Sequence, residues 1–249
     1  MKARRMEQLL LLDRVRIVLC GTSHPGNIGA AARAMKTMGL DTLYLVGPRR
    51  FPDPEAEAMA ARANDILDRA VLCSSLDDAL KGTLFAAACT ARSRDLSHAL
   101  LTAREAGVRL IQEAARGPVA LVFGPEKFGL TAEQVNRCSV IATVPTNRAY
   151  SSLNLAAAVQ VFAYEVRLAA EGIASLPQES FEPATYEEIE RFFEHLEGTL
   201  YAIGFLDPKQ PKRLMQRLRR LFQRTRLERE EVNILRGILA AAAKDRAGG

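Results

Sequence analysis

Short apolar runs alternate with helical patterns through the first 170 residues. The runs are mostly apolar and do not alternate regularly between apolar and polar positions, which is typical of strands buried on both faces of a parallel sheet. We predict strands at 15–20, 42–46, 70–73, 83–88, 120–124 and 140–144. We predict helices at 27–40, 55–63, 76–81, 103–115 and 154–170, with Ser75 as the N-cap of the third. This alternation favours an α/β fold with helices on both faces of the sheet.

The pattern changes after residue 170. Residues 171–184 contain two prolines and little periodicity, which indicates a linker. Beyond the linker only helical patterns occur, and we expect helices at 185–204, 208–224 and 228–244. The sequence therefore predicts an α/β domain at 1–170, a linker at 171–184 and a small all-helical extension at 185–249.

Composition narrows the class of protein. Hydrophobic residues make up 48% of the chain, which is enough for a sizeable core. The four cysteines are scattered and form no C-x-x-C pair, so we expect neither a disulfide framework nor a metal site. No apolar run reaches the roughly 18 residues that a membrane span needs, and no secretory segment is recognisable. We therefore expect a cytoplasmic protein without a membrane partner. The net charge of +5 weakly favours a polyanionic partner.

The first strand is followed by a glycine-containing loop and a helix. Gly21, Gly26 and Gly29 would either let the backbone approach a ligand or permit close packing of the helix, and the glycines alone do not decide between these. Arg33 stands on an otherwise small and apolar stretch of the helix. Because a guanidinium is rarely buried without a partner, Arg33 is either solvated or directed at an anion.

Two further segments place polar groups where a strand gives way to a helix. Gly124 directly follows a strand, and Glu126 is the only acid of the bend, where it either accepts backbone amides or is solvated. Thr131 is expected to cap the next helix. Ser152 and Asn154 precede a long apolar helix, as N-cap residues or as polar contacts to a ligand. Ligands in open α/β sheets gather at the carboxyl ends of strands, where these loops lie.

Basic residues dominate the segment 209–229, which contains nine Lys or Arg and one acid. On a helix, four of these arginines share a face: Arg213, Arg217, Arg220 and Arg224. A solvated amphipathic helix is one interpretation. Like charges at this spacing repel one another, however, and contact with phosphates would relieve that repulsion. Arg92 and Arg94 would extend the same RNA-binding footprint.

Together these segments resemble the SPOUT superfamily of knotted RNA methyltransferases, most closely the TrmJ type within its SpoU/TrmH-like branch. The resemblance is carried by Asn27 and Arg33, by the G-P-E-K-F-G-L block at 124–130 and by Y-S-S-L-N-L-A at 150–156. The helical extension is also similar to that of the TrmJ type, through long strings at 192–208 and 217–239. The resemblance therefore covers nearly the whole chain.

Fold, substrate and cofactor follow from the resemblance as expectations. It implies a trefoil knot in the parallel sheet domain, which pattern reasoning alone would reject. It implies a homodimer in which Arg33 serves the cofactor of the partner chain, and a tRNA substrate methylated on the ribose of cytidine or uridine at anticodon-loop position 32. The implied cofactor is S-adenosyl-L-methionine. The implied cofactor-binding residues are Cys89, Thr90, Ala91, Gly124, Glu126, Val144, Ser152 and Leu153.

The chemistry assigns roles to four candidate catalytic residues. Methyl transfer is an in-line displacement, and the obstacle is the weak nucleophilicity of a ribose hydroxyl. We expect Arg33 and Ser152 to contact the 2′-hydroxyl or its adjacent phosphate, with Asn27 and Asn154 holding this arrangement together. Because a guanidinium stays protonated in proteins, Arg33 would position and stabilise rather than act as the base. A phosphate is a candidate proton acceptor.

Three alternatives to a tRNA methyltransferase stay open. A non-catalytic RNA-binding protein on the same fold is disfavoured by the presence of Arg33, Ser152 and Asn154. A 2′-O-methyltransferase of ribosomal RNA is disfavoured by the extension, which resembles that of a tRNA enzyme. A small-molecule enzyme of the Rossmann type would lack the dinucleotide fingerprint and would leave the basic helix unexplained.

Overall fold

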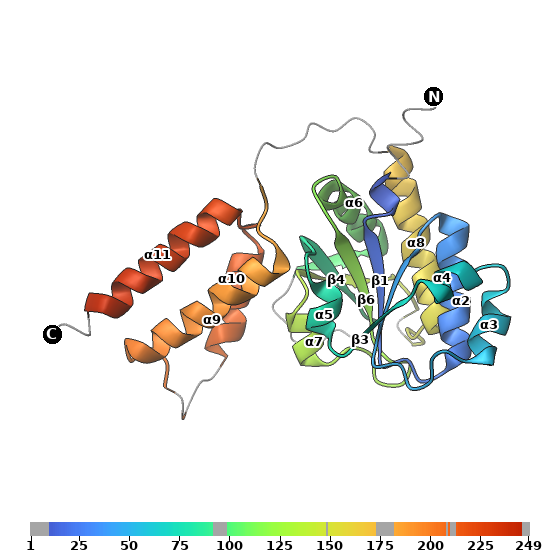
Figure 1. Ribbon diagram of the computed structural model, residues 1–249, viewed down its shortest axis with the longest axis horizontal. Helices are drawn as coiled ribbons and strands as arrows, with labels where there is room; N and C mark the ends of the chain where they lie inside the picture. The colour runs from blue at the N-terminus through green and yellow to red at the C-terminus, as the bar shows by residue number, and fades with distance from the viewer. Residues whose placement is uncertain are drawn as a thin grey trace. The chain divides into compact units, whose positions relative to one another are not determined.

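The chain divides into two compact units, residues 1–178 and 179–249. The structure is a computed structural model, and it describes residues 10–91, 99–147, 149–172, 182–207, 209 and 213–245 (Figure 1). The predicted RNA contacts Arg92 and Arg94 lie outside the described residues.

The first unit contains a seven-stranded parallel sheet. Its strands are β1 (Val15–Cys20), β2 (Thr42–Val46), β3 (Val71–Cys73), β4 (Phe85–Cys89), β5 (Leu100–Thr102), β6 (Val119–Phe123) and β7 (Val140–Thr143). Their order across the sheet is β3-β2-β1-β6-β4-β7-β5. Every pairing is parallel. The predicted α/β class is confirmed, and β4 and β6 are buried along their whole length, as the continuous apolar runs indicate.

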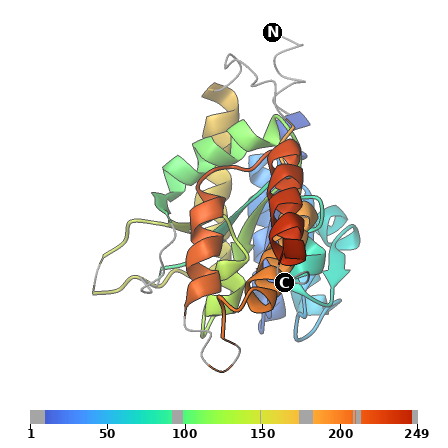
Figure 2. The same ribbon diagram turned by 90° about the vertical axis from the view of Figure 1, so that its left-hand side faces the viewer.

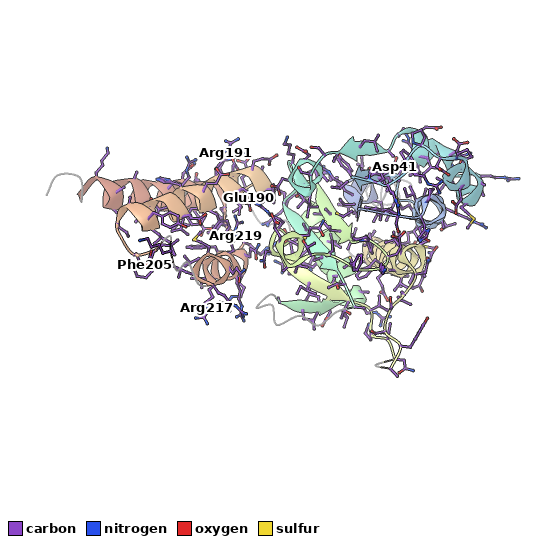
Figure 3. All side chains as sticks on the ribbon, turned by 90° about the horizontal axis from the view of Figure 1, so that it is seen from below. Asp41, Glu190, Arg191, Phe205, Arg217 and Arg219 are labelled. Carbon is purple, nitrogen blue, oxygen red and sulfur yellow. The ribbon has the colours of Figure 1, made fainter. Side chains whose placement is uncertain are left out.

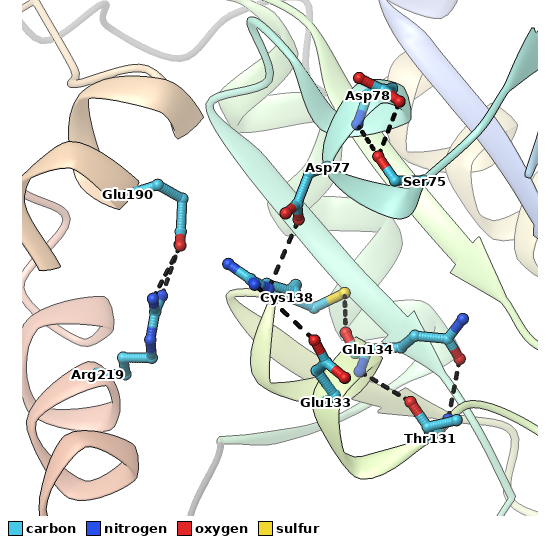
Figure 4. Close-up of polar contacts among 10 residues, drawn as sticks. Ser75, Asp77, Asp78, Thr131, Glu133, Gln134, Cys138, Glu190 and Arg219 are labelled. Carbon is cyan, nitrogen blue, oxygen red and sulfur yellow. Dashed lines mark hydrogen bonds and ion pairs between the residues drawn. The ribbon is translucent and has the colours of Figure 1, made fainter. Parts of the chain in front are cut away.

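Helices cover the sheet on both faces. The helices of this unit are α2 (Pro25–Met38), α3 (Pro54–Ala60), α4 (Asn64–Asp68), α5 (Leu76–Leu80), α6 (Ala103–Ala114), α7 (Ala132–Asn136) and α8 (Leu155–Gly172). In one layer α8 packs between α2 and α6, and α3 packs against α2 (Figures 1 and 2). The short helices α5 and α7 lie on the other side of the sheet and are joined by an ion pair between Asp77 and Arg137 (Figure 4).

Side-chain caps fix where several helices begin. The Ser75 hydroxyl accepts a hydrogen bond from the Asp78 amide at 3.1 Å, which confirms the predicted cap of α5. Thr131 and Gln134 form a reciprocal capping box at the start of α7, which confirms the second predicted cap (Figure 4). These caps satisfy amides that no turn of the helix can reach, so each loop enters its helix at a defined residue.

Gly29 belongs to a close contact between two helices. A Cβ atom built at this position would lie 1.9 Å from the carbonyl oxygen of Ala56 in α3, so no other residue fits without moving a backbone. Gly26 also packs on α3, where a Cβ would meet the Glu55 carboxylate at 2.8 Å. Close packing against the α3 backbone therefore accounts for Gly29, whereas the Glu55 side chain beside Gly26 is exposed and can move.

The second unit contains three helices around a small aromatic core. They are α9 (Tyr186–Ala202), α10 (Leu214–Gln223) and α11 (Arg229–Asp245). Phe192, Phe193 and Phe222 pack edge to face or tilted, with ring centroids 4.9–6.2 Å apart. The chain before α9 pairs with the residue before α11 through an isolated antiparallel bridge between Pro183 and Glu228. The predicted all-helical extension is confirmed, and the start expected at residue 208 for its second helix falls among undescribed residues.

The trefoil knot stays a prediction. The sheet order requires several long crossings, because the chain runs from edge strand β3 to central β4 and from edge strand β5 to central β6. Part of the segment between β4 and β5, residues 92–98, lies outside the part of the chain that the structure describes.

Candidate active site at the carboxyl ends of the strands

Four neighbouring strands bring the sequence motifs to one edge of the sheet. Strands β1, β6, β4 and β7 lie side by side in that order and run in the same direction. The loops that follow them contain the first glycine loop, the 124–130 block, residues 90–91 and the 150–156 motif, respectively. Segments more than 100 residues apart in the sequence therefore meet, as expected for a ligand site in an α/β fold.

Glu126 ties the second loop to the first. Its carboxylate accepts hydrogen bonds from the Ser23 amide at 3.0 Å, the Ser23 hydroxyl at 2.7 Å and the Asn27 side-chain amide at 2.8 Å. The His24 amide donates a fourth bond at 3.3 Å. The sequence left open whether Glu126 accepts loop amides or is solvated, and the structure shows it accepting them.

Asn27 and Asn154 extend this network to the third loop. The Asn154 side-chain amide donates to the Asn27 side-chain oxygen at 3.0 Å. The Asn154 oxygen accepts from the Ala156 amide at 2.9 Å, so the same side chain caps α8. Capping and loop contact thus occur together at this residue. Two side-chain hydrogen bonds thus form a path from Glu126 through Asn27 to Asn154. The path links the β6–α7 loop, α2 and the start of α8.

Electrostatics favour the ionised form of Glu126. Burial raises the pKa of this carboxyl, but the hydrogen bonds donated by Asn27 and Ser23 outweigh it and lower the pKa to about 2. The ordinary value is 4.5, so the group is a carboxylate throughout the physiological range. It therefore acts as a fixed acceptor for the loop amides rather than as an acid or base in the reaction.

We expect Glu126→Gln to lower the free energy of unfolding by about 1–2 kcal/mol at pH 7, because an amide cannot accept all four bonds. The native pKa is depressed, so the stabilisation is complete above about pH 4.5 and is lost as the pH falls toward 2. Denaturant unfolding of wild type and variant between pH 7 and pH 3 should show the difference narrowing.

Glu133→Gln is the matched control for Glu126, since the Glu133 side chain is 83% exposed and makes one ion pair at 3.9 Å. This control should change stability by less than about 0.5 kcal/mol at any pH. A Glu126 variant as stable as wild type at pH 7, or a difference that does not vary with pH, would contradict the assigned role.

Gly124 allows the β6–α7 loop to fold back on itself. A Cβ atom at this position would lie 2.2 Å from the Leu130 nitrogen and 2.3 Å from the Gly129 carbonyl carbon. Gly129 closes the turn with a positive φ of 65° and an amide that donates to the Pro125 carbonyl at 2.8 Å. The bend is therefore compact, and bare backbone faces the space between the loops.

A cavity of about 200 Å³ lies between these loops. All eight residues expected to bind the cofactor line it: Cys89, Thr90, Ala91, Gly124, Glu126, Val144, Ser152 and Leu153. The sequence interpretation missed its apolar floor, where Phe123 and Phe162 pack edge to face at 5.7 Å. Both are ordinary core positions in a strand and a helix, and their pattern does not distinguish a cavity wall from a core.

Arg33 is set apart from this cavity. It is exposed on α2, and its guanidinium has no hydrogen-bond or ion-pair partner within the described part of the chain. It does not line the cavity, and neither do Asn27 and Asn154. Six residues turn a helix through about 600°, so Arg33 lies about 120° around the helix from Asn27. Of the four candidate catalytic residues, only Ser152 reaches the cavity wall within one chain.

Cys89 lines the cavity as a neutral, buried thiol. The residue is 8% exposed, and burial raises the pKa of its thiol well above the ordinary value. Such a group is neither a nucleophile nor a metal ligand at neutral pH. Among the residues with described positions, no cluster of three or more His, Cys, Asp or Glu gathers in a way that could hold a metal ion. No helix among them is long and apolar enough to cross a membrane.

The arginines of α10 separate into two groups. Arg213, Arg217 and Arg224 are exposed and Arg220 is half-buried, and none of these four guanidiniums has a partner among the described residues. Arg219 instead forms a bidentate pair with Glu190 at 2.6 and 2.8 Å (Figure 4) and covers the Phe193 ring at 4.3 Å. Figure 3 shows Arg217 directed away from α9, whereas Arg219 faces Glu190. One face of α10 is thus structural and the other is an unneutralised basic surface.

Comparisons with known proteins connect both units to RNA modification. Residues 14–164 match the SpoU rRNA methylase family, and residues 187–248 match the C-terminal domain of tRNA methyltransferase TrmJ. A protein from Pectobacterium atrosepticum named tRNA (cytidine/uridine-2′-O-)-methyltransferase TrmJ is 50% identical over 237 residues, which cover 94% of this chain and 98% of the relative.

Solved structures agree with these matches. The crystal structure of TrmJ from Z. mobilis ZM4 superposes with a TM-score of 0.80 at 34% identity, covering 91% of this chain and 97% of that one. A structure described as giving insights into 2-OH methylation of C/U34 on tRNA superposes with a TM-score of 0.52 at 26% identity, covering 65% of this chain and 99% of that one.

Proposed function

This chain belongs to the SpoU methylase family, and from that premise we propose that it transfers a methyl group from S-adenosyl-L-methionine to a ribose 2′-hydroxyl of tRNA. The observation that carries the proposal is the hydrogen-bond path Glu126, Asn27, Asn154. It joins the three family motifs around a cavity at the carboxyl ends of β4, β6 and β7. The non-catalytic alternative does not explain why these polar side chains are held together beside a cavity.

The cavity fits a cofactor held mostly by backbone. The turn at Gly124 presents backbone where a side chain would not fit, and Cys89, Thr90 and Ala91 line the cavity at the end of the neighbouring strand β4. Phe123, Phe162 and Leu155 give the apolar floor that an adenine ring would pack against. When bound, S-adenosyl-L-methionine supplies a methyl group already activated on a sulfonium, so the protein needs no acid for the leaving group.

The chain's own residues then have to align the sugar hydroxyl with the methyl group and stabilise the charge that develops on its oxygen. Ser152 lines the cavity and can donate or accept a hydrogen bond at the sugar hydroxyl. The Arg33 guanidinium is always charged and planar, which suits a phosphate or a developing alkoxide. Because it is already protonated, it cannot take up the proton of the hydroxyl. Asn27 and Asn154 act through the loops that they connect, which makes them positioning residues. The adjacent phosphate is the proposed proton acceptor.

A homodimer completes this site. Arg33 does not line the cavity of its own chain, so we expect a second copy to bring a guanidinium to each cofactor. Helix α8 offers a surface for that copy, because it is apolar on a second face besides the one that it buries. This stripe consists of Ala157, Val161, Tyr164 and Leu168, of which Tyr164 is 48% and Leu168 is 40% exposed. A helix apolar on two faces is typical of burial on both sides.

We expect Tyr164→Glu and Leu168→Glu together to convert a dimer into a monomer, because two carboxylates would have to be buried in the contact. Light scattering after size exclusion should show the change in mass, and methyl transfer should fall with it. Leu72→Glu is the control, since Leu72 is 57% exposed on edge strand β3, away from α8. A double variant that remains dimeric would rule out this face.

The helical unit favours tRNA as the substrate. Four unneutralised arginines on one face of α10 supply a surface for a phosphate backbone. The target position that follows from the family type is cytidine or uridine 32 of the anticodon loop. Position 34 is the alternative, taken from the structure related to C/U34 methylation, but that similarity covers only 65% of this chain. A tRNA substrate also accords with the expected cytoplasmic location.

The proposal is tested by incubating the purified protein with radiolabelled S-adenosyl-L-methionine and either bulk tRNA or ribosomal RNA. We expect label in tRNA only, and nuclease mapping should place it on the ribose of nucleotide 32. Label in ribosomal RNA would favour the second alternative, and label at nucleotide 34 would correct the position. No transfer to either RNA would leave a non-catalytic binding protein.

A further inference from the structure

Two exposed aromatic side chains stand next in sequence to residues that line the cavity. Phe128 is 64% exposed and lies between Lys127 and Gly129, both of which line the cavity. Tyr150 is 82% exposed and immediately precedes Ser151, which lines the cavity from the third loop. Neither ring is needed for the fold, and the role assigned to the site above uses neither. Large apolar groups exposed beside a site call for an explanation, whereas single ones scattered over a surface do not.

The backbone holds Phe128 outward. The turn that carries it is closed by the Gly129 amide, which donates to the Pro125 carbonyl at 2.8 Å, and Gly124 folds the turn against Leu130. Glu126 anchors the near side of the same turn to Ser23 and Asn27. The Lys127 ammonium lies 5.4 Å from the centre of the Phe128 ring. The exposed ring is therefore presented by a fixed turn together with a positive charge.

A second hydrogen-bonded turn presents Tyr150. The Tyr150 amide donates to the Asn147 carbonyl at 2.9 Å, and the Ala149 amide donates to the Asn147 side-chain oxygen at 3.0 Å. The Thr146 hydroxyl donates to the Ser151 carbonyl at 3.3 Å and joins the two sides of the turn. These bonds satisfy backbone groups within the loop while the phenol ring projects beyond it.

Given the proposed tRNA activity, on which this inference rests, we propose that Phe128 and Tyr150 stack on unpaired bases that flank the methylated nucleotide. Sequence-specific enzymes of RNA loops commonly hold splayed bases on aromatic faces, because every base has a π face and needs no particular hydrogen bond. The two rings would grip the loop on either side of the cavity and leave the sugar between them. The Lys127 charge suits the phosphates of the same strand.

This role explains a feature of the site that cofactor binding does not. The cavity recognises the methyl donor and, through Ser152, one sugar hydroxyl, but nothing lining it selects an unpaired strand over a helix. Stacking on two rings requires bases that have left a helical stack. The pair therefore makes single-stranded loop RNA the substrate class and excludes the stem of the same tRNA.

The test replaces each ring by an apolar side chain without a π face. Phe128→Leu and Tyr150→Leu remove the π face, whereas Phe128→Tyr and Tyr150→Phe keep it, and Leu72→Ala on edge strand β3 is the exposed apolar control. We expect each leucine variant to raise KM for tRNA about tenfold and the double variant about a hundredfold, since stacking of one base contributes about 1–3 kcal/mol. The ring-keeping variants and the control should stay within twofold of wild type, and kcat should change little in all of them.

A second readout does not depend on turnover. Anticodon-loop RNA with 5-iodouridine next to nucleotide 32 is irradiated in complex with the protein, and the crosslinked peptide is identified by mass spectrometry. We expect crosslinks to Phe128 or Tyr150 in wild type and their loss in the matching leucine variant. Wild-type protein that crosslinks to the RNA but does not methylate it would refute the proposed function and still support base stacking by these two rings.

Several results would overturn the inference. Unchanged KM values in the double leucine variant, or crosslinks that map only to other residues, would exclude stacking by this pair. A weaker affinity for S-adenosyl-L-methionine in the leucine variants would make the rings part of the cofactor site. Dissociation of the dimer in those variants would make them a subunit contact. Calorimetry and light scattering on the same proteins distinguish these outcomes.

Discussion

Replacing Arg33 with alanine should lower the rate of methyl transfer by at least about a hundredfold and leave the affinity for S-adenosyl-L-methionine within about twofold of wild type. Arg33 is exposed on α2 without a partner among the described residues and does not line the cavity, so its removal creates neither a core defect nor a gap in the cofactor site. Single-turnover kinetics measures the rate, and calorimetry measures cofactor binding.

The charge alone does not account for the expected role of Arg33. A guanidinium presents a planar fork that can engage two oxygen atoms of a phosphate, and a lysine ammonium does not. Arg33→Lys should therefore recover only part of the lost rate. Full activity of Arg33→Ala would refute the catalytic role, and a parallel loss of cofactor affinity would reassign the residue to cofactor binding.

Mixing subunits tests whether Arg33 serves the partner's site. Arg33→Ala and Ser152→Ala homodimers should each be inactive. If Arg33 acts across the interface, a mixed dimer contains one site with both residues intact. After equal amounts are exchanged, about a quarter of the wild-type sites should be restored, because half the dimers are mixed and each has one good site. If Arg33 acts within its own chain, no activity returns.

Neutralising the basic face of α10 should produce the second large effect. We expect the fourfold change of Arg213, Arg217, Arg220 and Arg224 to alanine to weaken tRNA binding at least about tenfold at physiological salt. The slope of log affinity against log salt should become shallower by roughly 3.6, since each of the four lost phosphate contacts contributes about 0.9 to the slope. Filter binding across a range of salt concentrations measures both quantities, and the cofactor affinity should not change.

Arg219 is the matched control on the same helix. Its guanidinium is held by Glu190 and stacked on Phe193, so Arg219→Ala should lower the stability of the helical unit by about 1–3 kcal/mol. It should leave the salt dependence of tRNA binding unchanged, provided that binding is measured well below the unfolding transition. Equal effects of Arg219→Ala and the fourfold change on the salt slope would mean that charge position on α10 does not matter.

The sequence predicted those parts of the fold that depend on interactions between residues close together in the chain. The apolar runs of β4 and β6 are buried strands because nothing polar interrupts them, and Ser75 and Thr131 cap helices through bonds within three residues. Strand β5 escaped prediction because it is three residues long and half-exposed. Helix α4 has five residues and too few turns for a periodic pattern.

The site shows a similar division. Cysteine, glycine and serine positions around the cavity followed from the family resemblance, because residues that line a cavity with their backbone carry little signal of their own. Asn27 and Asn154 are 127 residues apart, and only the sheet order brings them within 3.0 Å. The structural role of Arg219 was hidden among nine basic residues, since spacing on a helix does not show which arginine meets Glu190.

The central claim is that loops after β1, β4, β6 and β7 form one site for the methyl donor. A crystal structure of the protein with S-adenosyl-L-homocysteine, the product of methyl loss, tests it most directly. We expect the ligand in the cavity against Gly124, Ser152 and Leu153, with Arg33 of the second copy facing its sulfur. A ligand bound elsewhere on the molecule, or no bound ligand at saturating concentration, would contradict it.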